Sequence, residues 1–178
     1  MKKEEILQRI EPLFFERSYK EVTLQDIAHI FDIKKASLYY YFPSKQELYL
    51  SVLEYSFVVY LEFIQDLIAR WNEENFQKLL HEFIEFPEVK KNLFSKINLH
   101  EHDLDTEPLN FIQEKQKEIF ETIHDALHKK AWFSKGKTYL FLILINQSFQ
   151  KKGAYGKCNI NIQDILHEIE KIFLTHNI

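Results

Sequence analysis

Glycine is nearly absent from this chain, and this scarcity restricts the fold more than any other feature of the sequence. Among 178 residues there are only three glycines, Gly136, Gly153 and Gly156, and only four prolines. A chain of this length built from β-strands would need many more turn-forming residues. The chain is therefore predicted to be all-α, with one core or with a small head joined to a larger helical body.

Composition and termini indicate an ordinary globular protein. Hydrophobic residues make up 46% of the chain and charged residues 28%, so a packed core is expected. The single cysteine, Cys158, cannot form a disulfide within the chain, and the first ten residues lack the apolar core of a signal peptide. The longest apolar run, Tyr139 to Ile145, is far shorter than the ~20 residues of a membrane-spanning helix. We expect a cytoplasmic protein with no membrane partner.

The first segment predicted to be helical, residues 3–17, contains a proline. Its apolar residues Ile6, Ile10 and Phe14 fall on one stripe of a helix. Pro12 lacks a backbone donor, so it either bends the helix or is tolerated on an exposed side. The sequence leaves both alternatives open.

Two short helices joined by a tight turn are predicted next. Thr23 stands at a helix N-cap with Asp26 three residues later, which is the spacing of a capping box. Asp32 lies in the turn, where aspartate can adopt a conformation that is unusual for other side chains. The second helix, residues 34–42, ends at Pro43 because the residue before proline disfavours helix. Such a pair suits duplex DNA, since the second helix can enter the major groove while the first crosses the backbone.

The remaining chain is predicted to form a helical body. A capping box at Ser44 opens a long helix that extends to about Trp71. Shorter helices are expected over 74–86 and 88–98, separated at Pro87, and another helix from Pro108 to about Lys130. We therefore predict a head, residues 1–44, that binds DNA and a helical body, residues 45–178.

Self-association is expected to use the last two helices of the body. Residues 139–145 are apolar on every face of a helix, and the final helix, residues 162–176, has a broad apolar stripe. This apolar surface exceeds what one small core needs. The predicted dimer interface consists of Leu140, Ile143, Ile165, Ile169 and Ile172.

The charge distribution bears on DNA binding. The net charge of −4 is unusual for a nucleic-acid-binding protein, but the first fifty residues carry eight basic and eight acidic side chains and are neutral. Between Ile33 and Gln46 the charged residues are Lys34, Lys35 and Lys45, all of them positive. This small surface is predicted to be basic, with the excess negative charge placed elsewhere.

The second short helix offers groups that suit DNA. Its outward residues carry ammonium and hydroxyl donors and flat rings, which fit phosphates and thymine methyl groups. These residues are Lys34, Lys35, Ser37, Tyr40 and Tyr41. Two adjacent lysines are more often a solvated turn, but the surrounding helix-turn-helix pattern favours the DNA-binding interpretation.

The region from Ile6 to Val52 carries the motifs VTLQDIA and IKKASLYYYFPSKQEL. This region, about a quarter of the chain, resembles the DNA-binding head of TetR-family regulators. The resemblance implies phosphate contacts by Thr23, Ser37, Tyr39, Tyr41 and Lys45, and base contacts by Lys35, Ala36 and Tyr40. Ser18, Asp32 and Ala36 stand where glycine is usual in the family.

The resemblance also implies a mechanism. Two recognition helices of a homodimer would bind successive major grooves of a palindromic operator, about 34 Å apart, and repress transcription. A small-molecule effector, expected to be apolar, would bind the body and release the DNA. No enzyme activity, cofactor or metal is predicted.

Seven aromatic residues of the body either line an apolar effector pocket or simply fill a core, and periodicity does not separate these alternatives. They are Tyr60, Phe63, Phe83, Phe86, Phe94, Phe111 and Phe120.

Two rival functions follow from other patterns. His124 and His128 are four residues apart on a predicted helix, and with the segment His100 to Asp103 they would suit a helical metalloenzyme, but no third ligand is identifiable nearby. The second rival is a protein-interaction module that keeps the fold without binding DNA, motivated by the neutral head and the missing glycines.

Overall fold

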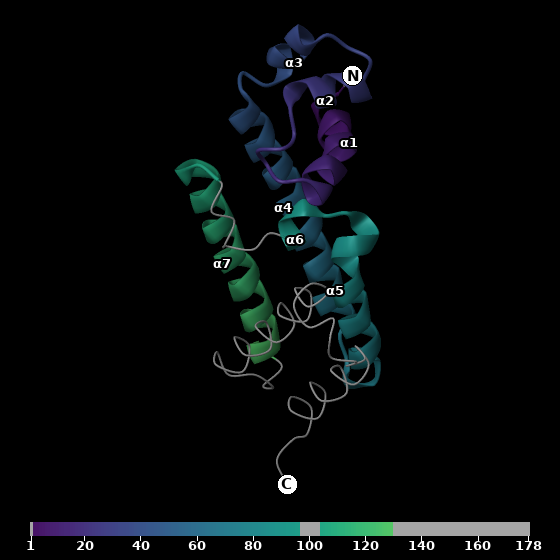
Figure 1. Cartoon of the computed structure of the whole chain (residues 1–178). Coiled ribbons are helices and arrows are strands. Elements are labelled where there is room, and N and C mark those ends of the chain that lie inside the picture. Colours follow the sequence, from purple (N-terminus) through teal and green to yellow (C-terminus); the bar gives the residue numbers. More distant parts are fainter. Residues whose placement is uncertain (1, 97–103, 130–178) are drawn as a thin grey trace, which may run out of the picture. The chain divides into compact units, whose positions relative to one another are not determined.

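The computed structural model describes residues 2–96 and 104–129, and within these ranges all regular structure is helical (Figure 1). The α-helices are α1 (Lys3–Glu16), α2 (Leu24–Ile30), α3 (Lys35–Tyr41), α4 (Lys45–Arg70), α5 (Phe76–Lys90), α6 (Leu93–Lys96) and α7 (Thr106–Lys129), with a short 3-10 helix η1 (Glu73–Asn75). The prediction of an all-α chain with a three-helix head is confirmed. The predicted dimer residues Leu140, Ile143, Ile165, Ile169 and Ile172, and the segment His100 to Asp103, lie outside the described residues.

Helix α1 is continuous through its internal proline. Pro12 lies within the helix and is half-buried, so the helix tolerates the loss of one backbone donor. At its start, the backbone N–H of Lys2 donates to the Glu5 carboxylate at 2.9 Å. The buried stripe of α1 contains Ile6, Ile10 and Phe14, as its periodicity predicts.

The turn between α2 and α3 is closed by local hydrogen bonds. Asp32 has φ 51°, the left-handed conformation that short polar side chains tolerate best after glycine. The N–H of Ile33 donates to the carbonyl of Ala28 at 3.1 Å, and the N–H of Asp32 donates to the carbonyl of His29 at 3.2 Å. These two bonds form a Schellman motif, so α2 ends at a defined angle to α3. The predicted role of Asp32 is confirmed.

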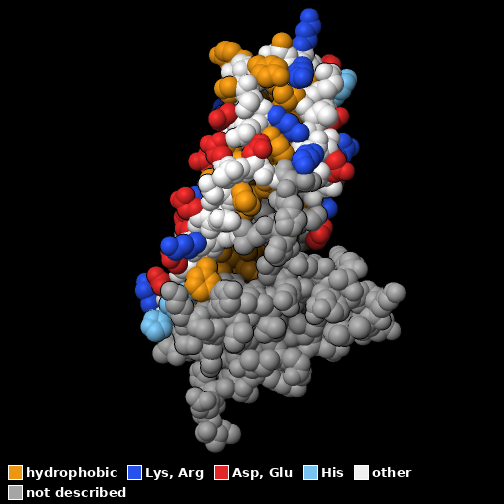
Figure 2. Space-filling model, turned by 60° about the vertical axis from the view of Figure 1, so that its left-hand side comes forward, with side chains coloured by type: hydrophobic (Ala, Val, Ile, Leu, Met, Phe, Trp, Pro, Cys, Tyr) orange, Lys and Arg blue, Asp and Glu red, His pale blue; other side chains and the backbone are white. Residues whose placement is uncertain are grey.

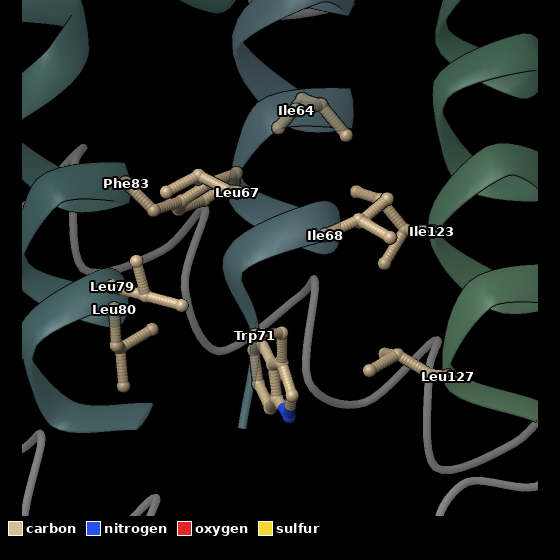
Figure 3. A pocket seen from close by; sticks show the side chains of 9 residues that line it. All are labelled: Ile64, Leu67, Ile68, Trp71, Leu79, Leu80, Phe83, Ile123 and Leu127. Carbon is tan, nitrogen blue, oxygen red and sulfur yellow. The ribbon is translucent and has the colours of Figure 1, made fainter. Parts of the chain in front are cut away.

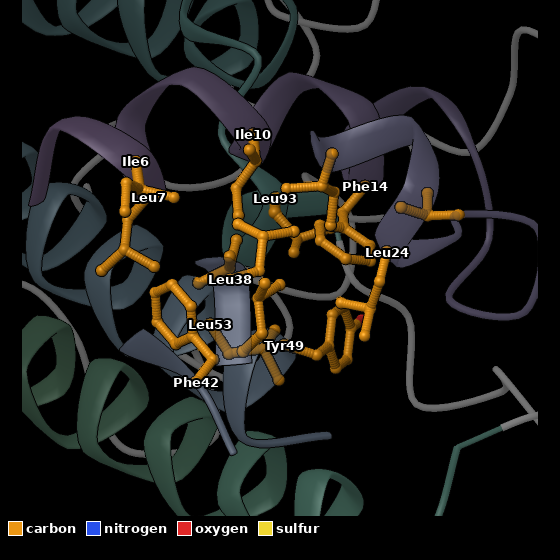
Figure 4. Packing of buried hydrophobic residues seen from close by; sticks show 14 of the residues in the cluster. Ile6, Leu7, Ile10, Phe14, Leu24, Leu38, Phe42, Tyr49, Leu53 and Leu93 are labelled. Atoms are coloured by element: carbon orange, nitrogen blue, oxygen red, sulfur yellow. The ribbon is translucent and has the colours of Figure 1, made fainter. Parts of the chain in front are cut away.

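Two compact units make up the chain. The first consists of residues 1–63 and 86–116, and its core gathers residues from α1 to α4, α6 and α7 (Figure 4). Buried members from beyond residue 44 include Leu48 and Leu53 of α4, Leu93 of α6 and Ile112 of α7. The head therefore shares its core with parts of the body.

The second unit consists of residues 64–85 and the chain from Lys117 onward. Its described buried residues come from the ends of α4, α5 and α7. On its surface, the Arg70 guanidinium bonds to the carboxylates of Asp66 at 2.7 Å and Glu82 at 2.8 Å. Among the residues that the structure describes, none of the helices is both long and apolar enough to cross a membrane.

The predicted helix break at Pro87 is wrong. Helix α5 continues through Pro87 to Lys90 and ends where Lys91 adopts φ 52° and the N–H of Asn92 donates to the Pro87 carbonyl at 3.2 Å. The proline removes one backbone donor, but it is buried beside Phe86, and this packing favours continuation of the helix. Of the helix predicted over 88–98, residues 88–90 belong to α5, Leu93–Lys96 form α6, and residues 97 and 98 lie outside the described residues.

Candidate nucleic-acid interface

Helix α3 is anchored by a single buried side chain and exposes the rest of its surface. Leu38 is 1% exposed and packs in the core of the first unit. Six of the remaining predicted contact residues of this helix and its N-cap are exposed: Lys34, Lys35, Ala36, Ser37, Tyr39 and Tyr40. The seventh, Tyr41, is half-buried. Every side chain predicted to contact bases is therefore open to solvent.

Tyrosines give this surface its apolar character. Tyr40 is 86% exposed and Tyr39 47%, values that are high for aromatic side chains, which are normally half-buried or more. The ring of Tyr41 meets that of Tyr40 edge-on, with centroids 5.1 Å apart and planes at 88°. Tyr41 thus buttresses Tyr40, which projects from α3 as a flat surface with a hydroxyl group at its tip.

Lysines lie near both ends of α3. Figure 2 shows basic and hydrophobic side chains together at the top of that view, with most of the acidic side chains further down. Lys34 and Lys35 are exposed at the start of α3, and the ammonium of Lys3 lies 5.2 Å from the ring of Phe42. Interleaved cations and rings suit a phosphate backbone and base edges.

Lys45 is half-buried, whereas Lys34 and Lys35 are exposed. It opens α4, and its ammonium lies 4.3 Å above the ring of Tyr19. Burial lowers the pKa of Lys45. Ser44 precedes it and accepts the N–H of Glu47 at 3.0 Å, so the predicted cap of this helix is confirmed.

Thr23 is exposed, but its hydroxyl already takes part in the capping box of α2. The hydroxyl accepts the N–H of Asp26 at 3.1 Å and donates to the Asp26 carboxylate at 2.8 Å. The Thr23 backbone N–H also donates to this carboxylate, at 2.9 Å. The backbone bond, and then the hydroxyl bond, lower the pKa of Asp26. Because its hydroxyl hydrogen and its backbone N–H both bond to the Asp26 carboxylate, Thr23 would donate to a phosphate only by giving up one of these bonds.

Arg9 is a positioning residue that sequence reasoning missed. From α1 it donates to the carbonyl of Ile30 at 3.0 Å, and its guanidinium lies 4.6 Å over the ring of Phe31. It therefore satisfies a carbonyl that the end of α2 leaves without a helical partner. Its hydrogen-bond partner Ile30 lies 21 residues away in the sequence, and no local pattern signals such a contact.

The seven aromatic residues predicted to line a pocket do not gather in one place. Tyr60, Phe63, Phe86 and Phe94 form a packed cluster in the first unit, in which Phe63 and Phe86 stack with centroids 3.9 Å apart. Phe111 packs against the core of the head. The other two, Phe83 and Phe120, belong to the second unit.

An apolar cavity of about 50 Å³ lies in the second unit (Figure 3). Side chains from α4, α5 and α7, with Trp71, surround it: Ile64, Leu67, Ile68, Trp71, Leu79, Leu80, Phe83, Ile123 and Leu127. Of the seven predicted residues only Phe83 lines this cavity. Its space suits a small apolar group, since drug-sized ligands occupy roughly 300 Å³ or more.

The histidine pair on α7 forms a stack of rings. Phe120, His124 and His128 lie nearly parallel, with successive centroids 6.2 Å and 5.6 Å apart. The Nδ1 atom of His124 lies 3.1 Å from the Asp125 carboxylate. Within the described part of the chain, no group of three or more histidine, cysteine or acidic residues is placed to hold a metal ion.

Comparison with known proteins agrees with this geometry. Residues 6–52 match the family described as "Bacterial regulatory proteins, tetR family". The biofilm operon icaADBC HTH-type negative transcriptional regulator IcaR of Staphylococcus epidermidis is 31% identical over 133 residues, which cover 71% of this chain and 68% of that protein.

Solved structures share the fold over almost the whole chain. The structure of AibR with isovaleryl coenzyme A and operator DNA is similar at a TM-score of 0.69 and 18% identity, covering 97% of this chain and 98% of that one. The regulator FadR from Bacillus subtilis, in complex with stearoyl-CoA, gives a TM-score of 0.69 at 12% identity, with 98% of both chains covered.

Proposed function

The chain belongs to the TetR family of bacterial transcriptional regulators, and we propose that it is a repressor that binds a palindromic operator as a homodimer and releases it when an effector binds. Its family consists of regulators and not of enzymes, as the sequence predicts. Because its target would be chromosomal DNA, we place the protein in the cytoplasm.

The exposed surface of α3 is the observation that carries this proposal. A helix held by one buried leucine, with Tyr40 86% exposed beside two lysines, would enter a major groove without moving the core. We assign base contacts to Lys35, Ala36 and Tyr40. Lys34, Ser37, Tyr39, Tyr41, Lys45 and Thr23 would contact phosphates and fix the register on the duplex.

The proposal of repression rests on relatives, and the proposal of dimerisation rests on the predicted dimer surface. IcaR is named a negative regulator, and AibR is described with operator DNA. In the proposed dimer, two copies of α3 lie about 34 Å apart, one turn of B-DNA. Leu140, Ile143, Ile165, Ile169 and Ile172 remain the proposed interface.

The proposed effector is apolar or carries an acyl chain. Every side chain around the cavity of the second unit is hydrocarbon or aromatic, and Phe83 is the residue of the predicted pocket that lines it. AibR and FadR are described with acyl-CoA ligands. An effector would release DNA only by favouring the conformation that does not bind DNA.

Selection from random duplex DNA at physiological salt tests the DNA-binding proposal. The native protein is compared with a Lys35→Ala, Tyr40→Ala double variant. An enriched palindrome that the variant no longer selects supports both the operator and the assignment of α3. If the native protein enriches no sequence, the repressor proposal fails and an interaction module with this fold is favoured.

The effector proposal has its own test. Acyl-CoA compounds of increasing chain length should raise the Tm of the native protein and weaken operator binding. Ile123→Phe, which places a larger side chain in the cavity, should abolish both effects while leaving operator binding intact. Equal responses in the two proteins would place the effector elsewhere.

A further inference from the structure

Three polar residues are buried among those that the structure describes, and hydrogen bonds connect them to helix α6. Glu11 of α1 is 6% exposed, Ser56 of α4 0% and Asn92, just before α6, 1%. Asn92 Nδ2 donates to the Ser56 carbonyl at 3.0 Å, and the Ser56 side chain acts to lower the pKa of the Glu11 carboxyl. We call Glu11, Ser56 and Asn92 the buried triad.

The buried triad accepts the first three backbone N–H groups of α6, one per residue. The N–H of Leu93 donates to Oε1 of Glu11 at 2.9 Å, that of Phe94 to Oγ of Ser56 at 2.7 Å, and that of Ser95 to Oδ1 of Asn92 at 2.9 Å. These are the donors that a helix start leaves without partners. Helix α6 is therefore joined by directional bonds to α1 and α4, which are distant from it in the sequence.

A gain in folding stability alone is a weak explanation for burying the polar side chains of the buried triad. Burial raises the pKa of Glu11, opposed by the Ser56 side chain and by the hydrogen bond from Leu93, which means that desolvation of the carboxylate is incompletely offset. Well-packed apolar side chains often serve a core as well as buried charges do. What a hydrogen-bonded carboxylate adds is a fixed direction and register between helices.

Helix α1 connects the buried triad to the DNA-binding surface. Two residues before Glu11, Arg9 binds the end of α2 at the carbonyl of Ile30. Ile10 packs in the same core as Leu38, the anchor of α3 (Figure 4). Helix α6 also contributes Phe94 to the aromatic cluster, where its ring lies 6.3 Å from that of Tyr60. The same ring lies 5.2 Å from that of Phe57 on α4.

We propose that Glu11 is a positioning residue for DNA binding: with Ser56 and Asn92 it locks the start of α6 against α1 and α4 and so holds α3 in the orientation that binds the operator. The inference rests on the proposed operator binding, while the positioning of the helices by the buried triad is tested independently of DNA. A residue with this role changes DNA affinity without contacting DNA.

The first measurement is operator affinity, with a matched control. Glu11→Gln preserves shape but replaces one acceptor oxygen by a donor, whereas Glu16→Gln removes the same charge from an exposed position on α1. With both proteins fully folded by circular dichroism, the Kd of Glu11→Gln should rise about ten-fold, given the strength of hydrogen bonds to charged groups. Glu16→Gln should stay within about two-fold of the native protein, as is usual for a surface change.

The second measurement reports orientation without DNA. Spin labels at Gln25→Cys on α2 and Val89→Cys on α5, both exposed, are placed in a full-length Cys158→Ser background. The distance distribution should broaden or shift with Glu11→Gln and stay unchanged with Glu16→Gln. If Glu11→Gln fails to fold, Ser56→Ala replaces it, with the same expectation.

The outcomes separate this inference from the proposed function. If Glu11→Gln matches Glu16→Gln in distances, or loses affinity with unchanged distances, the positioning role is overturned. If the native protein selects no operator, the proposed function fails, and the distance distributions alone still decide the role of the buried triad.

Discussion

The aromatic residues of α3 and those of the cluster around Phe86 have opposite surroundings. Tyr39 and Tyr40 are exposed, while Phe63 and Phe86 stack with centroids 3.9 Å apart and Phe86 is buried. Rings that stack on each other are used for packing, whereas rings left in water are free for a ligand. Exposure distinguishes the proposed binding surface from the core.

The largest effect should come from truncating a ring of the cluster. Phe86→Ala removes a buried aromatic side chain and should lower the free energy of unfolding by about 3 kcal/mol or more. Tyr40→Ala should change it by less than about 0.5 kcal/mol, because the side chain is 86% exposed. Urea unfolding of both variants measures this difference, and equal losses would remove the distinction between the two regions.

The anchor of α3 should show the next largest effect. Leu38→Ala leaves a cavity beneath the helix and should cost about 2 to 4 kcal/mol. Leu38→Met, which conserves volume, should cost less than about 1.5 kcal/mol. Thermal unfolding checks both variants. An Ala variant as stable as the native protein would mean that α3 is held by other contacts.

The capping box of α2 should contribute less. Thr23→Ala should cost about 1 kcal/mol at pH 7. Because the pKa of Asp26 is lowered in the folded state, its contribution is present above the pKa of an unfolded aspartate, about 3.9, and is lost as pH falls through the folded-state value. Unfolding from pH 7 down to pH 3 should therefore show the difference between native and variant shrinking. A constant difference would contradict this origin.

The smallest effect concerns a single phosphate contact. Lys45→Ala should weaken binding to all duplexes alike and reduce the slope of log K against log salt by about one. Lys117→Ala on α7, an exposed lysine paired with Glu121, is the matched control and should leave the slope unchanged. Fluorescence anisotropy between 50 and 200 mM salt, a range in which such contacts are readily seen, gives both slopes. Identical slopes would remove Lys45 from the interface.

Local features of the fold were predictable from the sequence, and distant contacts were not. The capping box at Thr23 and the left-handed Asp32 depend on neighbouring residues, so their pattern is visible in the chain. The Leu93–Glu11 bond joins residues 82 positions apart, and no periodicity signals it. Helix continuation through Pro87 was missed because packing outweighed propensity there.

The same distinction between local features and distant contacts applies to the candidate site. The exposed face of α3 followed from spacing, because one buried residue in a short helix leaves the others outside. Whether seven aromatic residues enclose a cavity depends on how they pack in three dimensions. Periodicity places them on helix faces without deciding between a packed cluster and a pocket.

Operator affinity of Tyr40→Ala is the measurement that tests the central claim most directly. The native protein and the variant are titrated with a selected operator and with a random duplex of equal length at one salt concentration. The account predicts that the variant binds the operator about ten-fold or more weakly, binds the random duplex almost unchanged, and keeps its unfolding free energy, because a base contact is worth roughly 1–3 kcal/mol. Unchanged operator affinity in the folded variant would contradict the assignment of α3 as the DNA-recognising helix.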